Sequence, residues 1–274
     1  MTKKFFLAAA LIAVAAVFTA CSKDDEENNN PNIVREQPVD LSKLTGDFEA
    51  EDGDVLTGTL GGNYYVSIAD GATVTLDNAA INGVHNENYK WAGLTCKGTA
   101  TIVLKGENNI KGFNVTYSGI FVPENKTLTI EGDGSLTASC GTDEFNGAWA
   151  AGIGACSTIN CGSIVIKGGN ITAIGGDSSA GIGGGPAGKC GNITISGGTI
   201  NASGGDFSAG IGGSTLSECG DITITNTVTS VTAMKGNGAP YSIGPGNEGI
   251  CGTITIGGED KGSGITDSPY TYQP

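Results

Sequence analysis

A repeat of about 29 residues dominates the second half of the chain. Each copy begins with Cys-Gly, continues with an alternating Ile-x-Ile segment and a Gly-Gly pair, and ends in Ala-Gly-Ile-Gly or a related segment. The leading cysteines are 29, 29 and 32 residues apart, at Cys161, Cys190, Cys219 and Cys251. The same apolar alternation occurs upstream at Leu128/Ile130, Ile102/Leu104 and Val74/Leu76. A fixed period of this length indicates units that stack on one another.

Three short apolar segments make up each repeat, and glycine-rich corners separate them. Alternation with a period of two is typical of strands, and no segment between them is long or periodic enough for a helix. A three-residue strand is stable only if it pairs with its counterpart one repeat later. The sequence therefore predicts an all-β solenoid, a parallel β-helix with about seven coils of three short strands.

Stacking in register places equivalent residues of successive coils side by side. Two interior ladders are expected, Ile164–Ile193–Ile222–Ile254 and Ile166–Ile195–Ile224–Ile256. Outward columns are expected at Thr129–Val165–Thr194–Thr223–Thr255 on the first strand and at Thr137–Thr172–Asn201–Thr232 on the second. On the third strand, Gly152, Gly181 and Gly210 are expected to leave a flat outward strip that ends at Ser242. A ligand could approach the backbone closely at such a strip.

The N-terminal 45 residues differ in composition from the repeat region. Residues 1–20 are interpreted as a lipoprotein signal peptide, with Lys3 and Lys4 before an apolar run that is too short to span a membrane. The segment Phe18-Thr19-Ala20-Cys21 resembles a bacterial lipobox, which implies that Cys21 is lipidated; cleavage elsewhere would leave Cys21 as an ordinary thiol. Residues 21–45 then form an acidic tether, 46–258 the β-helix and 259–274 a C-terminal cap or tail. Residues 46–54 are expected to cover the other end.

Several motifs of this chain together resemble those of a known protein family. The lipobox, the Gly-x-Ile-Thr-Ile-x-Gly-Gly and Ala-Gly-Ile-Gly-Gly segments, and Trp91-Ala-Gly-Leu-Thr-Cys96 resemble a family of repetitive surface lipoproteins commonly labelled carbohydrate-binding. That family is similar in fold to the right-handed, pectate-lyase-like β-helices. The resemblance implies a right-handed solenoid anchored to the outer membrane through the lipid on Cys21. It also implies a surface-exposed monomer that binds a polysaccharide or glycoconjugate.

The charge and composition of the chain limit the classes of function that it can have. The net charge of −14 becomes −16 once residues 1–20, with two lysines and no acids, are removed, which excludes general binding to nucleic acid. The chain has one histidine, His85, and one arginine, Arg35, which lies in the tether. We therefore expect a carbohydrate-binding protein without catalytic turnover. The alternatives are a structural adhesin or spacer of the cell surface and a polysaccharide lyase-like enzyme.

The candidate carbohydrate-binding residues are of two kinds. Thr172, Asn201 and Thr232 form a hydroxyl- and amide-lined column, and the aromatic rings of Trp149, Phe207 and Trp91 offer apolar surfaces on which sugars stack. Two alternatives remain open at this stage. Threonine and asparagine columns are also ordinary soluble strand surface, and the aromatic rings could shield corners of the core.

Asp177 and Asp206 each follow a Gly-Gly corner and are 29 residues apart, so they are expected to stack, with Asp143 near the same column. Carboxylates at this spacing repel one another unless a cation intervenes, and Ca²⁺ bound by oxygen ligands is the candidate cofactor. The alternative is that each aspartate caps a turn.

Seven cysteines remain besides Cys21, and no CxxC spacing suggests a metal site. Four of them lead the repeats and lie one strand spacing apart, within the range for disulfides. We favour a column of small, buried, reduced side chains over disulfide bridges.

Overall fold

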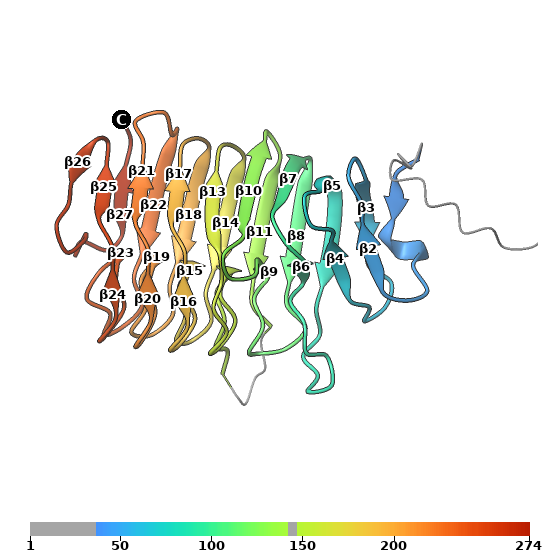
Figure 1. Ribbon diagram of the computed structural model, residues 1–274, viewed down its shortest axis with the longest axis horizontal. Coiled ribbons are helices and arrows are strands. Elements are labelled where there is room, and N and C mark those ends of the chain that lie inside the picture. The colour runs from blue at the N-terminus through green and yellow to red at the C-terminus, as the bar shows by residue number, and fades with distance from the viewer. Residues whose placement is uncertain (1–36, 142–146) are drawn as a thin grey trace, which may run out of the picture. The chain divides into compact units, whose positions relative to one another are not determined.

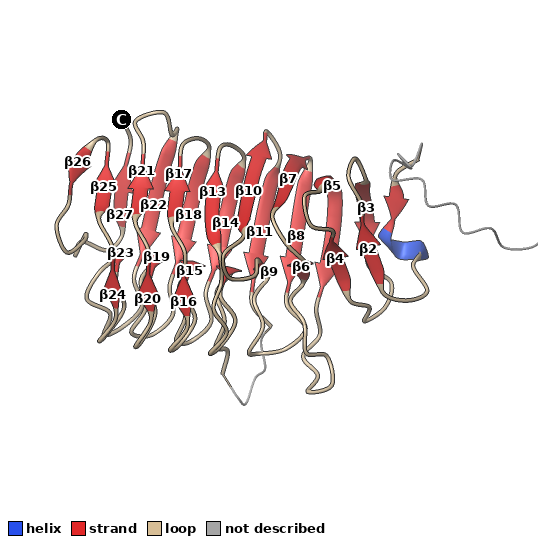
Figure 2. Ribbon diagram, viewed as in Figure 1, coloured by secondary structure: helices blue, strands red, loops and turns tan. Residues whose placement is uncertain are grey.

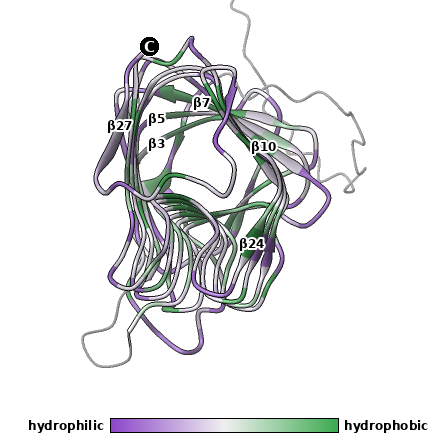
Figure 3. Ribbon diagram, turned by 90° about the vertical axis from the view of Figure 1, so that its left-hand side faces the viewer, coloured by the Kyte–Doolittle hydropathy of each residue, from purple (hydrophilic) through white to green (hydrophobic). Residues whose placement is uncertain are grey.

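The computed structural model describes residues 37–141 and 147–274, which form a right-handed parallel β-helix (Figure 1). Apart from one short 3-10 helix, η1 (Leu41–Lys43), its regular elements are all strands (Figure 2). The coils superimpose when viewed from the C-terminal end (Figure 3). The predicted lipidation site Cys21 and the candidate calcium ligand Asp143 lie outside the described residues.

Each coil passes through a first, a second and a third ladder of parallel strands. The first-ladder strands are β7 (Ala100–Lys105), β10 (Thr127–Gly132), β13 (Ser163–Ile166), β17 (Ile193–Ile195), β21 (Ile222–Ile224) and β25 (Ile254–Ile256). Those of the second ladder are β8 (Glu107–Lys111), β11 (Ser135–Ser139), β14 (Asn170–Ile174), β18 (Thr199–Ser203) and β22 (Ser230–Met234). The third ladder contains β2 (Phe48–Ala50), β4 (Val66–Ile68), β6 (Leu94–Cys96), β9 (Ile120–Phe121), β12 (Ile153–Gly154), β15 (Ile182–Gly183), β19 (Ile211–Gly212) and β23 (Ile243–Gly244).

Strand β5 (Thr73–Asn82) runs through both of the first two ladders, because its first half pairs with β7 and its second half with β8. The first two ladders are therefore one 16-stranded sheet rather than the two sheets expected from the repeat. If β5 is taken as both first and second strand, six coils are complete. A shorter coil of β3 (Val55–Thr59) and β4 precedes them.

A small additional sheet lies where the chain enters the first ladder. It contains β16 (Lys189–Cys190), β20 (Glu218–Cys219) and β24 (Ile250–Cys251), which pair in parallel in that order. The Cys-Gly segments thus run parallel in neighbouring coils, as stacking in register requires.

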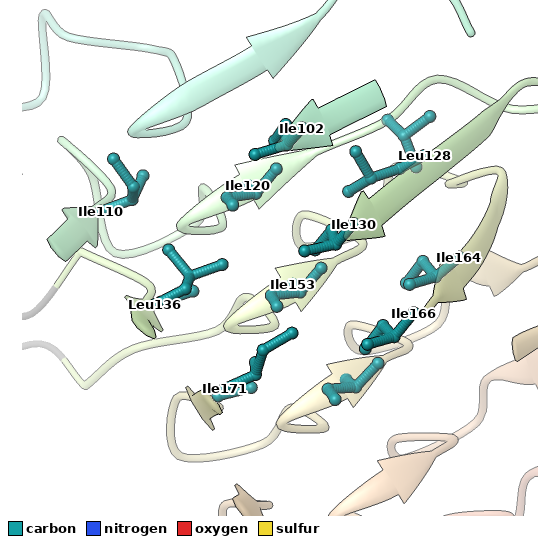
Figure 4. Packing of buried hydrophobic residues seen from close by; sticks show 14 of the residues in the cluster. Ile102, Ile110, Ile120, Leu128, Ile130, Leu136, Ile153, Ile164, Ile166 and Ile171 are labelled. Atoms are coloured by element: carbon teal, nitrogen blue, oxygen red, sulfur yellow. The ribbon is translucent and has the colours of Figure 1, made fainter. Parts of the chain in front are cut away.

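The two predicted isoleucine ladders are confirmed. Ile164, Ile193, Ile222 and Ile254 pair in register, as do Ile166, Ile195, Ile224 and Ile256, and all eight are buried. Upstream, Leu128 and Ile130 continue both ladders (Figure 4). Isoleucines and leucines of the second and third ladders fill the same interior, and burial of each such side chain contributes roughly 1.5–3 kcal/mol.

The ends of the solenoid differ from the sequence-based boundaries. Strand β1 (Val39–Asp40) pairs with β3, and the buried Leu41 of η1 packs into the core, so the folded region begins before the predicted boundary at residue 46. Residues 46–54 contain β2 and belong to the third ladder instead of covering the end. At the other end, β26 (Glu259–Asp260) and β27 (Tyr270–Tyr272) pair antiparallel with β25 and β22.

Candidate functional site

The outward side of the second ladder, called here the second face, carries the candidate polysaccharide column. Thr137, Thr172, Asn201 and Thr232 pair in register along four coils, in the order expected from the sequence. The column is longer than expected. Asn109 precedes Thr137 in register, and Thr271 of the antiparallel β27 follows Thr232, with their hydroxyl oxygens 3.1 Å apart.

Two further columns flank this one on the second face. One contains Glu107, Ser135, Asn170, Thr199 and Ser230. The other contains Lys111, Ser139, Ile174, Ser203 and Met234. All charged outward residues here belong to β8, so the face is uncharged from β11 to β22. In a chain with a net charge of −14, this is a surface suited to neutral ligands.

A shallow hollow lies on the second face across β8, β11 and β14. Its volume is about 520 Å³, and Asn109, Thr137 and Thr172 form part of its lining together with Glu107 and Asn170. The hollow thus contains one of the candidate binding residues, Thr172, and part of the same column. Its lining supplies hydroxyl, amide and carboxylate groups within one continuous surface.

Exposed apolar side chains border the polar column on one side. Ile174 and Met234 end their strands with 43% and 44% of their surface exposed. Neither was among the residues expected from the sequence, although each lies two residues after a column residue and therefore points to the same side of its strand. They alternate with Ser139 and Ser203 in the flanking column, so the second face has a polar centre and a partly apolar strip on one side, called here the apolar margin.

The loops that follow the second ladder stack on one another. A Cβ at Gly205 would lie 1.9 Å from the carbonyl oxygen of Gly176, and one at Gly236 would lie 1.7 Å from that of Gly205. Trp149 and Phe207 lie in loops of this stack, 40% and 44% exposed. The loop of Trp149 follows β11 and that of Phe207 follows β18, so both aromatic rings lie beyond the C-terminal ends of second-ladder strands, as Ile174 and Met234 do at the ends of β14 and β22.

Trp91 has a different environment from Trp149. Its ring centroid lies 6.1, 5.1 and 5.9 Å from those of Tyr65, Tyr89 and Phe113, and Phe113 is buried. Trp91 thus packs within an aromatic cluster against the core. This is the shielding that the sequence left open as the alternative to sugar binding.

The expected glycine strip on the third ladder is wrong. Gly152, Gly181 and Gly210 are buried, and so is Ser242. A Cβ at Gly181 would lie 2.8 Å from both the Ala173 carbonyl oxygen and the Ser203 nitrogen. Only glycine fits at these positions, because the chain passes close to the backbone of the second ladder. The second ladder covers these glycines, so no ligand can reach them.

Asp177 points toward the loop of the preceding coil. Its Oδ2 accepts the backbone N–H of Ala148 at 3.3 Å, so this bond joins two stacked loops and is not a cap of the aspartate's own turn. Asp206 is exposed in the next stacked loop. The described residues hold no group of three or more His, Cys, Asp or Glu side chains arranged for a metal ion. Calcium binding by Asp177 and Asp206 stays a prediction.

His85, the single histidine, supports the backbone: its Nδ1 accepts the N–H of Val115 at 3.4 Å.

The seven cysteines of the described region are all free thiols, in agreement with the interpretation favoured from sequence. Burial raises the pKa of Cys96 to about 12 and those of Cys140 and Cys156 to about 11. These three thiols are protonated at neutral pH.

The fold and the repeat define this chain as a parallel β-helix protein. Segments 128–155, 164–186 and 193–215 match the family model of the β-helix repeat. The three matches coincide with three consecutive coils, and the last two start at the interior isoleucines Ile164 and Ile193. No curated protein and no solved structure gives a significant match. No helix in the described part of the chain is long and apolar enough to cross a membrane.

Proposed function

We propose that this protein binds carbohydrate, holding an extended neutral polysaccharide on the second face without chemical turnover. The observation that carries the proposal is the continuous column of hydroxyl and amide groups from Asn109 to Thr271. Successive coils are about 4.8 Å apart, so a polymer lying along the column meets an equivalent group in every coil. Hydroxyl and amide groups both donate and accept hydrogen bonds, as sugar hydroxyls require.

The apolar margin supports the same ligand class. Small-ligand sites combine apolar surface with a few placed polar groups. Ile174 and Met234 supply exposed apolar surface beside the polar column, and Trp149 and Phe207 supply more in the loops that follow the second ladder. The C–H faces of pyranose rings pack on such surface. The uncharged character from β11 to β22 favours a neutral polymer over an anionic one.

Affinity electrophoresis of the protein against a panel of neutral and anionic polysaccharides tests the proposal. We expect at least one neutral polysaccharide to retard migration, with and without EDTA. The Trp149→Ala variant should be retarded less, although it melts at the same temperature. If no polysaccharide in the panel retards the protein, the proposal is wrong and the adhesin or spacer alternative takes its place.

The lyase-like alternative is tested separately. Such enzymes use an arginine or lysine base, and the only arginine, Arg35, lies outside the described residues. We expect incubation with pectins to yield no unsaturated products by ultraviolet absorbance. Accumulation of such products would contradict binding without turnover.

We also propose that the lipid on Cys21 anchors the protein to the outer membrane, with the solenoid exposed at the surface. The lipobox-like segment before Cys21 supports this location. Cys21→Ser should release the protein from the membrane fraction, and protease added to intact cells should degrade only the anchored form. A membrane-bound Cys21→Ser protein would contradict lipid anchoring.

A further inference from the structure

Four cysteine thiols form a continuous column inside the wall of the solenoid, one in each of four successive coils. Cys190 pairs in register with Cys219, and Cys219 with Cys251. Backbone hydrogen bonds run along the same column: the N–H groups of Gly191, Gly220 and Gly252 donate to the carbonyl oxygens of Cys161, Cys190 and Cys219. All four are reduced. The column ends at Cys251 in the last coil.

The final pair differs from the interior pairs in the neighbours that hold it. Residues paired in neighbouring parallel strands lie about 4.8 Å apart, within the 4.4–6.8 Å range of Cα separations in disulfides. Strand β20 lies between β16 and β24. The outer side of β16 is held by the preceding coil, because the Cys161 N–H donates to the Lys189 carbonyl oxygen at 2.7 Å, whereas β24 pairs with β20 alone. The cap strands β26 and β27 pair with β25 and β22. A disulfide between Cys219 and Cys251 therefore fits the Cα separation of this pair and has to be accommodated on one side of β24 only.

Solvent also reaches the column from this end. Cys161, Cys190 and Cys219 are buried, but Cys251 is only partly so. Cys251 lines a cavity of about 370 Å³ beside Tyr241 and the exposed Ile250. A small oxidant entering this cavity meets Cys251 before any other thiol of the column.

We infer that Cys219 and Cys251 are a site of disulfide formation by exchange with a low-molecular-weight disulfide. The Cys251 thiolate attacks one sulfur of that disulfide, forms a mixed disulfide and releases one thiolate. The Cys219 thiolate then attacks Cys251 Sγ and releases the second small thiolate. Two protein thiols are oxidised and one small disulfide is reduced to two thiols, so atoms and electrons balance.

The column itself controls the rate of this exchange. The hydrogen bond with the Cys219 thiol, together with burial, raises the pKa of Cys251 above its ordinary value. The thiolate is the attacking species, so a raised pKa leaves little of it at neutral pH. Exchange should therefore be slow at pH 7 and accelerate as the pH rises. The resulting bond would tie the last coil to the preceding one and restrict the unfolded chain.

The test uses the full chain and oxidised glutathione at pH 8.5, followed by acid quenching, alkylation of free thiols and tryptic mass spectrometry. Cys190 and Cys219 share the tryptic peptide 190–235, and Cys251 lies in 236–261. We expect these two peptides to be joined in the wild type and in Cys190→Ser. The joined species should be absent in Cys219→Ser and Cys251→Ser.

A second measurement separates disulfide formation from loss of folding in the variants. The oxidised wild type should melt at a higher temperature than the reduced form, and dithiothreitol should reverse the shift. The inference is overturned if glutathione stays attached to Cys251. It is equally overturned if a bond forms inside peptide 190–235, or if the joined species persists in Cys219→Ser.

Discussion

Asn192 Oδ1 accepts the backbone N–H of Asp221 at 2.9 Å, and these two residues occupy the same place in consecutive coils. The pattern repeats on both sides. Asp221 Oδ1 accepts the N–H of Thr253 at 2.7 Å, and Ser163 Oγ accepts the N–H of Asn192 at 3.2 Å. Each residue directly precedes the first interior isoleucine of its coil. This column of side chains therefore fixes the start of the first ladder from one coil to the next.

Asp221→Ala should lower the free energy of unfolding by about 1 kcal/mol, because the hydrogen bond to Thr253 is lost while its N–H remains accessible to water. Urea denaturation measures the change. Asn226→Ala, at an exposed turn in the same coil, serves as the control and should stay within about 0.5 kcal/mol of the wild type. Equal losses in the two variants would show that the column does not hold the coils together.

Asn108 is a polar residue inside the apolar second ladder, in register with Leu136. It is 4% exposed, accepts the N–H of Ala79 at 2.9 Å, and donates to the carbonyl oxygens of Lys105 and Ser135 at 2.9 and 3.0 Å. Asn108→Ala should cost roughly 1–3 kcal/mol for each buried group left unpaired. Its outward neighbour provides the control: Asn109→Ala should melt close to the wild type, and a comparable loss there would contradict this role.

Gly212 has a backbone conformation and a contact that only glycine permits. Its φ is +127°, and a Cβ would lie 2.2 Å from the carbonyl oxygen of Gly244 in the next coil. Gly212→Ala should therefore destabilise the fold by at least the roughly 1–3 kcal/mol of a strained backbone, measured by thermal unfolding. Gly46→Ala, with no atom within 4 Å of the added Cβ, should change the melting temperature little. Similar melting of both variants would refute the close approach.

The bond from Ala148 to Asp177 predicts how the protein responds to calcium. If Asp177 serves to hold the Ala148 N–H of the preceding coil, Asp177→Ala lowers the free energy of unfolding by about 1 kcal/mol, and millimolar Ca²⁺ leaves the wild-type melting temperature unchanged. Calorimetric titration with thermal melts provides the measurement. A rise in melting temperature with Ca²⁺ that is lost in Asp177→Ala and in Asp206→Ala would instead support cation bridging.

Much of the fold can be predicted from the repeat, because only one register between neighbouring coils places the isoleucine side chains in the interior. The ladders of Ile164 and Ile166, and the column from Thr137 to Thr232, depend only on the period and on alternation along a strand. The prediction of an accessible glycine strip on the third ladder is wrong because alternation indicates which side of a strand a residue faces, but not what lies next to that side. Gly181 is on the expected side, yet the second ladder occupies the space there.

Less of the candidate site could be predicted from the sequence, because contacts outside the repeat place several of its residues. Thr271 joins the column only because β27 turns back antiparallel beside β22, and no repeat motif marks that strand. Asn108 occupies an interior position that Leu136 and Ile171 hold in the next two coils, so the repeat predicts an apolar residue there. Leu41 closes the N-terminal end from a segment that the composition assigned to the tether. Long-range contacts outside the repeat decide each of these positions.

Polysaccharide binding by matched lysine variants most directly tests whether the second face is the binding surface. Thr172 and Thr194 are half-buried outward threonines at the centres of β14 and β17, on the second and first ladders. On the polysaccharide that retards the wild type most, Thr172→Lys should lose most of its retardation, whereas Thr194→Lys should keep it. Loss of retardation in Thr194→Lys, with binding retained in Thr172→Lys, would contradict a ligand on the second face.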